Sequence, residues 1–143
     1  MSGDELPPGA PASPDEVWRL LTGVVTDSRD VWKRAVVERT GMPFSRIRIL
    51  RRLLPEPLPL KALARAAAMD APATTVVVND LEARGLVSRE IAPEDRRCKL
   101  VTITTAGREV LELAMSTPDP PPPGLADLPP HQLRTLRDLL RLL

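Results

Sequence analysis

A charged run in the second half of the chain offers the clearest chemistry. Asp95, Arg96 and Arg97 stand between two stretches, 86–91 and 99–104, in which apolar and polar residues alternate. This alternation predicts two strands joined by a charged turn. An arginine at the tip of such a hairpin can enter the narrow, electronegative minor groove of DNA, and a neighbouring carboxylate can orient it. A turn that is merely solvated is the alternative interpretation.

A capped helix is expected just before this hairpin. Asp70 is a favourable N-cap, and Gly85 is a favourable C-terminal stop. Helical spacing predicts an inner face made by Thr74, Val77, Val78 and Leu81. The outer face then carries the candidate DNA contacts, which are Pro72, Ala73, Thr75, Val76 and Asn79. Asn79 suits adenine and the apolar side chains suit thymine methyl groups, although an exposed asparagine is more often simply solvated.

Basic residues concentrate in the same part of the chain. Residues 45–108 hold twelve basic and seven acidic side chains, a net charge of +5, whereas the whole chain has only +1. Arginine outnumbers lysine seventeen to three, and its planar group can bind phosphate through two hydrogen bonds. A GC-rich coding sequence explains that ratio, but not the clustering. The candidate phosphate contacts are Arg46 and Arg48, for which a solvated helix face is the alternative, and Arg84 and Arg89, which flank the wing.

Side chains that could catalyse a reaction or bind a metal are scarce. The chain has one cysteine, one histidine and no tyrosine. Cys98 and His131 are too isolated in the sequence to suggest a nucleophile–base pair or a zinc site. A single cysteine also excludes an internal disulfide. We therefore expect a protein that is not an enzyme and that holds no metal or other cofactor.

Further helices are expected to position these elements. Ser13, Pro14 and Glu16 form a helix start, and Gly41 with Pro43 ends a helix of about 27 residues, roughly 40 Å long. That length exceeds what a minimal core needs, so its apolar face is expected to pack on another subunit. Shorter helices are predicted over 45–54, 60–69, 105–115 and 128–143.

Two details of these helices are also predicted. In the helix over 45–54, Ile47, Leu50 and Leu54 are expected to face inward. Prolines 55, 57 and 59 are expected to close that helix, and the proline-rich segment 118–123 is expected to form a stiff extended connection.

The order of helix, tight turn, helix and hairpin predicts a winged helix-turn-helix. The fold class is therefore mainly α with a small β hairpin, and with N- and C-terminal dimerisation helices. We expect the DNA-binding domain over 43–104 and the dimerisation helices over 13–42 and 105–143. Residues 1–12, which are rich in proline and glycine, are expected to form a disordered tail.

The residues of the hairpin resemble a known signature. The run 95–107 is similar to the wing of the MarR family of bacterial transcriptional regulators, in which Asp-x-Arg is followed by Val-x-Leu-Thr-x-x-Gly. The matching positions are Asp95, Arg97, Val101, Thr104 and Gly107, with Ile103 in place of leucine. Leu63-Ala64, residues 81–87 and residues 128–143 resemble other parts of the family, so that the resemblance covers roughly 14–143.

This resemblance implies a homodimeric regulator, often a repressor, that binds double-stranded DNA at a palindromic operator. Some members are released from DNA by a small ligand or by oxidation. By position, Arg97 would enter the minor groove and Asp95 would hold the wing in shape. The resemblance also suggests a ligand pocket, with Trp18, Trp32, Phe44 and Leu50 as possible lining residues; ordinary core positions are the alternative. Thiol-sensing relatives carry their cysteine in the first helix, so we do not expect Cys98 to be a redox switch.

Two departures from the family leave a second interpretation open. Val76 and Asp80 stand where relatives often carry arginine or another polar residue, and Asp80 would oppose phosphate if it faced DNA. The alternative is therefore a winged-helix protein-interaction module without sequence-specific DNA binding. The other departure is the fifth helix, which the proline segment shortens, so the first and last helices must supply more of the dimer interface.

The expected location follows from what the N-terminal sequence lacks. The acidic, proline-rich start has neither the basic nor the apolar region of a signal peptide. No run of apolar residues is long enough to cross a membrane. We expect a cytoplasmic, nucleoid-associated protein with no membrane partner.

Overall fold

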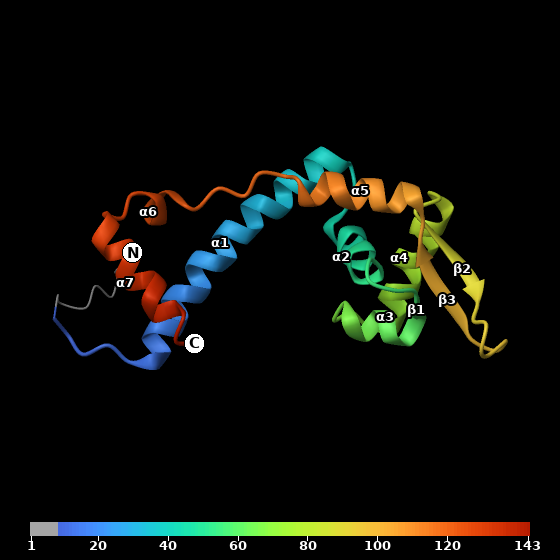
Figure 1. The fold of residues 1–143 in the computed structure, drawn as a ribbon, viewed down its shortest axis with the longest axis horizontal. Helices are drawn as coiled ribbons and strands as arrows, with labels where there is room; N and C mark the ends of the chain where they lie inside the picture. The colour runs from blue at the N-terminus through green and yellow to red at the C-terminus, as the bar shows by residue number, and fades with distance from the viewer. Residues whose placement is uncertain (1–8) are drawn as a thin grey trace. The chain divides into compact units, whose positions relative to one another are not determined.

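Residues 9–143 are described by a computed structural model, and they divide into two units (Figure 1). One unit runs from Trp32 to Pro118, and the other combines the residues up to Val31 with those from Asp119 to Leu143. The first eight residues of the predicted disordered tail lie outside the described part of the chain. The elements are α1 (Pro14–Thr40), α2 (Phe44–Leu53), β1 (Leu58–Pro59), α3 (Leu60–Ala66), α4 (Ala71–Ala83), β2 (Val87–Ile91), β3 (Lys99–Ile103), α5 (Thr105–Met115), α6 (Pro123–Ala126) and α7 (Pro130–Leu140).

The unit from Trp32 to Pro118 has a small antiparallel sheet at its edge. Strands β2 and β3 form the predicted hairpin, with Val87 opposite Ile103 and Ile91 opposite Lys99. The hairpin extends beyond the helices as a wing (Figure 1). Fold class and wing are as the sequence predicts.

A third strand was not predicted. Leu58 and Pro59 form β1, which pairs with β3 and gives the strand order β1-β3-β2. From the sequence, prolines 55, 57 and 59 predict the end of the helix over 45–54 but no strand. Proline is nevertheless tolerated on an edge strand, where its missing N–H faces away from the sheet.

The core of this unit is made by one apolar face from each of its helices and from the sheet. Its most deeply buried members include Val36, Ile47, Ile49, Leu50, Leu53, Leu63, Val78, Leu81 and Val101. The prediction that Leu54 faces inward is wrong. Leu54 is 45% exposed and Leu53 is 1% exposed. The buried face of α2 is formed by Ile47, Ile49, Leu50 and Leu53, and Leu54 lies about 100° further round the helix than Leu53.

The ends of the long helix follow the predicted pattern. The backbone N–H of Glu16 donates to the Ser13 hydroxyl oxygen at 3.2 Å, which caps the first turn of α1. Gly41 follows the last turn with a φ of +68°, a conformation that glycine adopts without strain. The proline segment differs from its prediction at one end. Pro123 begins the short helix α6, since proline at the first turn of a helix loses no hydrogen bond.

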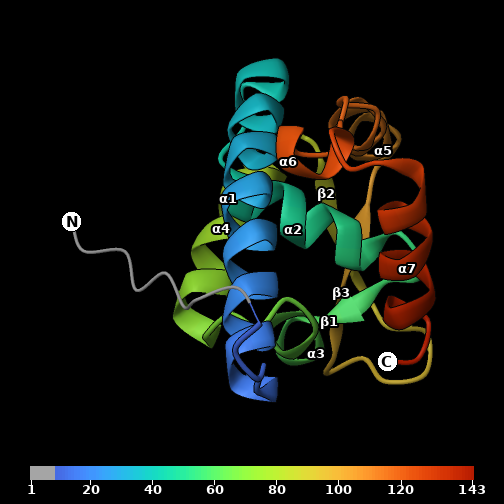
Figure 2. The ribbon, with the colours of Figure 1, turned by 90° about the vertical axis from the view of Figure 1, so that its left-hand side faces the viewer.

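The other unit leaves a large apolar surface open. Side chains of α1, α6 and α7 line one groove in this unit, and α7 stands apart from α1 across it (Figure 2). This groove of about 630 Å³ is lined by Leu21, Val24, Leu125, Leu128, Leu136 and Leu140 among others. Arg29 donates to the Asp119 carboxylate within the same unit. In the part of the chain that the structure describes, no helix has the length and hydropathy needed to span a membrane.

Candidate nucleic-acid interface

The helix expected to read DNA is capped and oriented as the sequence predicts. The Asp70 carboxylate accepts the backbone N–H of Ala73 at 2.7 Å, which satisfies a free donor of the first turn of α4. The inner face of α4 is buried through Thr74, Val77, Val78 and Leu81. The opposite face, which carries the candidate base contacts, is therefore directed away from the core.

The tight turn between α3 and α4 has an unusual backbone. Ala68 adopts a left-handed conformation with a φ of +53°. Its N–H donates to the Arg65 carbonyl, and the N–H of Met69 donates to the Ala64 carbonyl at 3.0 Å. These two hydrogen bonds form the Schellman ending of a helix, which usually places glycine where Ala68 stands.

The candidate base contacts differ in how much of their surface is exposed to solvent. Pro72, Val76 and Asn79 are exposed, whereas Ala73 and Thr75 are half-buried. Val76 alone leaves 61% of its surface open. The Thr75 hydroxyl donates to the Ala71 carbonyl at 3.0 Å, so only its lone pairs remain for DNA. The outer face thus offers few donors of its own.

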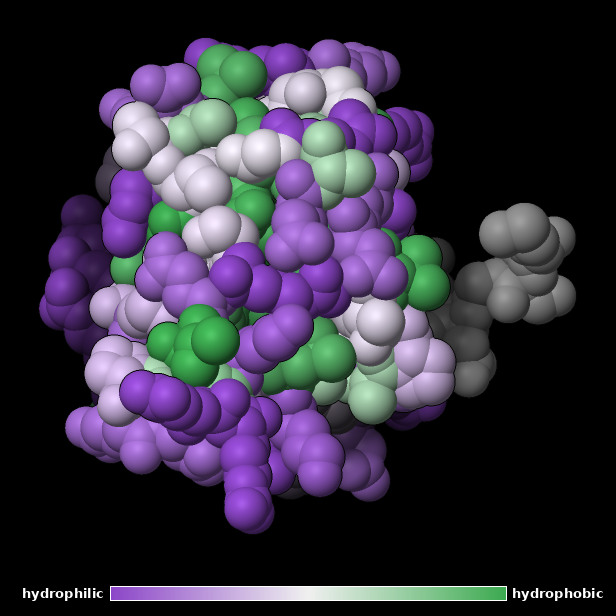
Figure 3. Space-filling model, turned by 90° about the vertical axis from the view of Figure 1, so that its right-hand side faces the viewer, coloured by the Kyte–Doolittle hydropathy of each residue, from purple (hydrophilic) through white to green (hydrophobic). Residues whose placement is uncertain are grey.

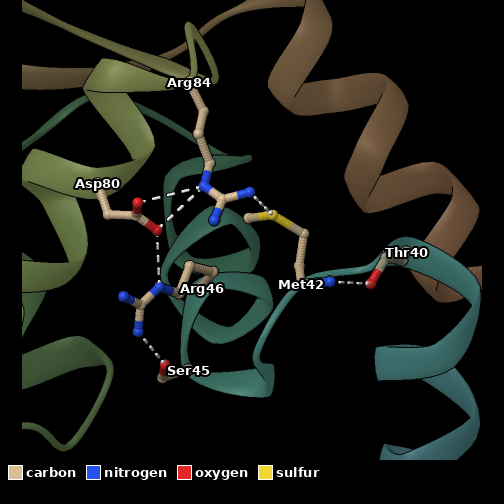
Figure 4. A network of polar contacts seen from close by, with 6 residues as sticks. All are labelled: Thr40, Met42, Ser45, Arg46, Asp80 and Arg84. Atoms are coloured by element: carbon tan, nitrogen blue, oxygen red, sulfur yellow. Dashed lines mark hydrogen bonds and ion pairs between the residues drawn. The ribbon is translucent and has the colours of Figure 1, made fainter.

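Asp80 lies in an arginine network that joins two helices (Figure 4). Arg46 of α2 donates to its carboxylate at 3.0 Å, and Arg84 donates to both carboxylate oxygens at 3.2 Å. The hydrogen bond from Arg46, followed by that from Arg84, holds the pKa of Asp80 below its usual value. The negative charge that was expected to oppose phosphate is therefore matched by two arginines.

A terminal guanidinium nitrogen of each arginine makes one further contact. Arg46 also donates to the Ser45 hydroxyl at 3.0 Å, and Arg84 contacts the Met42 sulfur at 3.6 Å. Two of the four candidate phosphate contacts are thus fixed in place before DNA arrives.

Asn79 is held by an arginine of the neighbouring strand. Arg89 of β2 donates to the Asn79 side-chain oxygen at 2.7 Å and to the Glu82 carboxylate at 2.9 Å. The sequence placed Asn79 and Arg89 in the interface as separate contacts, and Glu82 was not considered. The sequence does contain a sign that Glu82 lies beside Asn79. The two residues are three positions apart, which places them on one face of a helix.

The shape of the wing depends on Asp95. Its carboxylate accepts the backbone N–H of Arg97 at 3.0 Å, and its carbonyl accepts the N–H of Cys98 at 3.0 Å. These bonds close the turn through the backbone and leave the side chains of Arg96 and Arg97 exposed. A shallow hollow of about 430 Å³ beside the wing is lined by Lys61, Arg89, Arg97 and Lys99 together with Cys98 and others.

The base of the wing depends on Gly107, which in the sequence is only one position of the wing signature. A Cβ at Gly107 would lie 2.1 Å from the carbonyl oxygen of Leu86, so no side chain fits there. The Thr104 hydroxyl accepts the Gly107 N–H at 3.1 Å and donates to the Gly85 carbonyl at 2.7 Å. The start of α5 is therefore packed directly on the backbone that leads from α4 into the wing.

The surface on the wing side is hydrophilic (Figure 3), and several of its arginines are ion-paired. Seen from the wing side, the molecule is mostly hydrophilic, with apolar side chains in small separate groups (Figure 3). Of the candidate phosphate contacts, Arg46, Arg84 and Arg89 are ion-paired and Arg48 is half-buried. An approaching phosphate would meet Arg96, Arg97 and Lys99 as exposed cations.

The four candidate pocket residues lie in different surroundings. Trp32 and Phe44 meet edge to face with ring centroids 5.7 Å apart, and Lys33 lies 5.2 Å from the centre of the Phe44 ring. Leu50 is fully buried in the core, whereas Trp18 is 67% exposed on α1 in the other unit. Across residues 9–143, no three His, Cys, Asp or Glu side chains are grouped as metal ligands.

Comparison with known proteins extends this picture. A model of the MarR family matches residues 40–97. The crystal structure of a probable transcriptional regulator from Pseudomonas aeruginosa is 31% identical in sequence, covers 86% of this chain and 96% of its own, and superposes with a TM-score of 0.59. The chain belongs to the MarR family of transcriptional regulators.

Two further matches cover different shares of the chain. YdgJ of Bacillus subtilis, an uncharacterized HTH-type transcriptional regulator, is 36% identical over 74 residues, which is 51% of this MarR-family chain and 45% of YdgJ. The match therefore spans about half the length of that curated relative. CouR from Rhodococcus jostii RHA1, solved with p-coumaroyl-CoA bound, is 26% identical and covers 89% of this chain and 90% of its own, with a TM-score of 0.64.

Proposed function

We propose that this chain is a DNA-binding repressor of transcription that acts as a homodimer on a palindromic operator. The observation that carries the proposal is the pairing of the capped helix α4, whose outer face is free of the core, with a wing that exposes Arg96 and Arg97. In a winged helix-turn-helix, the helix enters the major groove while the wing reaches the adjacent minor groove or backbone.

Each part of the interface has a distinct role in this proposal. Pro72, Ala73, Thr75, Val76 and Asn79 would face base edges, and Arg97 would enter the minor groove with Arg96 beside it and Asp95 closing the turn. Arg46, Arg48 and Arg84 would contact phosphates, whereas Arg89, the fourth candidate, is bound to Asn79 and Glu82. Because Asp80 already compensates part of the charge on Arg46 and Arg84, the wing is expected to supply more of the salt-dependent affinity than these helix arginines.

The homodimer is proposed from the unit that contains α6 and α7. Its apolar side chains remain open to solvent, with Trp18, Leu20, Val24 and Val25 between 54% and 67% exposed. Isolated apolar side chains are common on surfaces, but a contiguous set indicates an interface. A two-fold dimer would present two copies of α4 about one DNA turn apart, and the operator would be an inverted repeat.

We also propose that a small molecule controls the binding and that the protein acts on the nucleoid in the cytoplasm. Of the four residues considered for an effector pocket, Trp32 and Phe44 meet edge to face within one unit and are the starting candidates, since Leu50 is fully buried and Trp18 belongs to the other unit. CouR, a relative at 26% identity, was solved with p-coumaroyl-CoA. If an effector weakens DNA binding by a given factor, DNA must weaken effector binding by the same factor.

Fluorescence anisotropy tests the DNA-binding proposal. The purified chain is titrated into labelled duplexes from around its own coding region, with scrambled duplex as competitor, at several salt concentrations. Binding that falls steeply with salt and that scrambled DNA cannot displace is the expected result, because phosphate contacts release counterions. Absence of binding at low salt would instead favour the alternative that the chain is a winged-helix module that binds another protein. The exposed Val76 on α4 would then contact that protein.

A further inference from the structure

We infer that Arg89 determines which base Asn79 selects, and that the selected base is guanine rather than adenine. The inference rests on the proposed function, since it concerns the reading of DNA by α4. Arg89 acts here as a positioning residue: its contact with Asn79 fixes what the amide can offer to a base edge.

The chemistry of the contact fixes the orientation of the amide. An arginine side chain has donors and no acceptor, so the atom of Asn79 that faces it at 2.7 Å must be the oxygen. The amide NH₂ group then points away from Arg89. Asn79 is exposed, and its free group is a donor.

A second contact keeps the guanidinium in this position. One terminal nitrogen of Arg89 donates to Asn79 and the other donates to the Glu82 carboxylate at 2.9 Å. The side chain of Arg89 is only 25% exposed, compared with 43% for Glu82. Two of its five N–H donors are thus engaged by α4, and moving the side chain toward a phosphate would stretch both bonds, including the ion pair with Glu82.

The base preference follows from the edges in the major groove. An unrestrained asparagine pairs with adenine through two bonds, accepting from N6 and donating to N7. Arg89 takes one of the two lone pairs of the oxygen, and its positive charge beside the amide makes the remaining lone pair a weaker acceptor for N6 and the NH₂ group a stronger donor. Guanine presents two neighbouring acceptors, N7 and O6, and does not need the amide oxygen as an acceptor. An Asn79 whose oxygen is bound to Arg89 therefore favours guanine.

Selection from a random duplex library tests this inference with the full-length chain. Wild type, Asn79→Ala, Arg89→Met, Arg89→Lys and Arg108→Met are each used to enrich duplexes, and the bound pools are sequenced. The position whose preference disappears in Asn79→Ala is the one that Asn79 reads. We expect guanine there for wild type and for Arg89→Lys, which keeps a donor to the oxygen, and a shift to adenine for Arg89→Met. Arg108→Met, the same change on α5, should match wild type.

A base analogue gives a second measurement that uses only the wild-type protein. Replacing the selected guanine by 7-deazaguanine removes the N7 acceptor, and the affinity should fall about threefold to tenfold, the usual effect of one net hydrogen bond. This measurement holds even if Arg89→Met fails to fold, which circular dichroism would reveal.

Three results would contradict the proposals, and they are distinguishable. Adenine at the Asn79 position for wild type overturns the inference. Guanine retained by Arg89→Met, with a uniform loss of affinity and a smaller salt slope, also overturns it and makes Arg89 a phosphate contact. Failure of wild type to enrich any sequence overturns the proposed function itself.

Discussion

At the scale of single residues, three of the six arginines in the proposed interface already have protein partners. Arg46 and Arg84 bind Asp80, and Arg89 binds Glu82 and Asn79. Arg97 differs, because its backbone is fixed by Asp95 while its side chain is exposed. An exposed cation at a fixed position needs little rearrangement to enter a narrow minor groove.

Replacing Arg97 should therefore weaken DNA binding without affecting the fold. We expect Arg97→Ala to reduce affinity for an operator about tenfold and to leave the melting temperature unchanged. Anisotropy titrations at matched salt measure the first effect, and circular dichroism measures the second. Arg108→Ala on α5 is the control. Equal affinities for Arg97→Ala and wild type would remove Arg97 from the interface.

Gly107 gives a prediction about stability rather than binding. A methyl group there would meet the Leu86 carbonyl oxygen, which belongs to the backbone and has little room to move. Gly107→Ala should lower the free energy of unfolding by about 1–3 kcal/mol, the usual cost of overpacking. Urea denaturation measures this. The control is Gly23→Ala, since nothing lies within 4 Å of a Cβ at Gly23, and alanine is the better helix former. An unchanged midpoint for Gly107→Ala would contradict the close approach.

At the scale of elements, local signals in the sequence were sufficient for most of the fold. The caps at Ser13 and Asp70 and the stop at Gly85 lie within a few residues of what they bond, so the boundaries of α1 and α4 were predictable. The hairpin was predictable because its alternation is itself local. Strand β1 was not, because two residues show no period and their partner β3 is about forty positions further along the chain.

The contacts within the interface were less predictable for the same reason. Asp80 is four residues from Arg84 but thirty-four from Arg46, and only the fold brings α2 and α4 together. A sequence read residue by residue therefore assigned Asp80 a repulsive role and Arg46 a free charge. Leu54 was misplaced because helical spacing allows either leucine to follow Leu50 on the inner face, and only the packing of α2 shows that this face includes Ile49 and Leu53.

The ion pairs between α2 and α4 predict a dependence of stability on pH. The pKa of Asp80 lies below its ordinary value of 3.8 because Arg46 and Arg84 donate to the ionised carboxylate. A carboxyl with a lowered folded-state pKa stabilises the fold above the unfolded pKa, and this contribution is lost as the pH falls through the folded value. Asp80→Asn should lower the melting temperature at neutral pH and have a diminishing effect below pH 3.8.

Thermal melts of wild type and Asp80→Asn across this pH range test the prediction. Asp138→Asn is the matched control, because Asp138 pairs with Arg137 on an exposed surface of α7, where an ion pair contributes little. A constant difference between wild type and Asp80→Asn down to the lowest pH would show that charge at Asp80 is not what stabilises the fold.

The turn between α3 and α4 allows a stabilising substitution. Ala68 has a φ of +53°, and the left-handed region costs an alanine roughly 1–2 kcal/mol relative to its ordinary conformations. Part of this is offset by the greater freedom of glycine in the unfolded chain. We expect Ala68→Gly to raise the free energy of unfolding by up to about 1 kcal/mol.

Urea denaturation of Ala68→Gly, beside Ala66→Gly, tests this. Ala66 lies in the last turn of α3, where glycine should destabilise by up to about 1 kcal/mol. If both substitutions lower the midpoint equally, the left-handed turn at Ala68 is not strained.

At the scale of the whole molecule, the proposed homodimer requires the apolar residues of α1, α6 and α7 to be covered. Val24→Glu places a charge on the groove that these helices line, and burial of an unpaired charge is costly. We expect wild type to sediment as a dimer and Val24→Glu to shift toward monomer.

Analytical ultracentrifugation at several concentrations measures this shift. Ile91→Glu is a matched control, because Ile91 is 60% exposed and Val24 is 54% exposed, but Ile91 lies at the end of strand β2 in the wing. A wild-type chain that remains monomeric throughout, or a Val24→Glu chain as dimeric as wild type, would count against this interface.

The ion pair between Arg46 and Asp80 also has a mechanical consequence. It links α2 to α4 by a hydrogen bond between opposite charges, in addition to the apolar contacts that pack the two helices together. Sliding one helix past the other would stretch this bond, whereas turning both together leaves it intact. A force applied to α2 is therefore expected to tilt α4 as a whole. The side chains on the outer face of α4 would keep their arrangement relative to one another during that tilt.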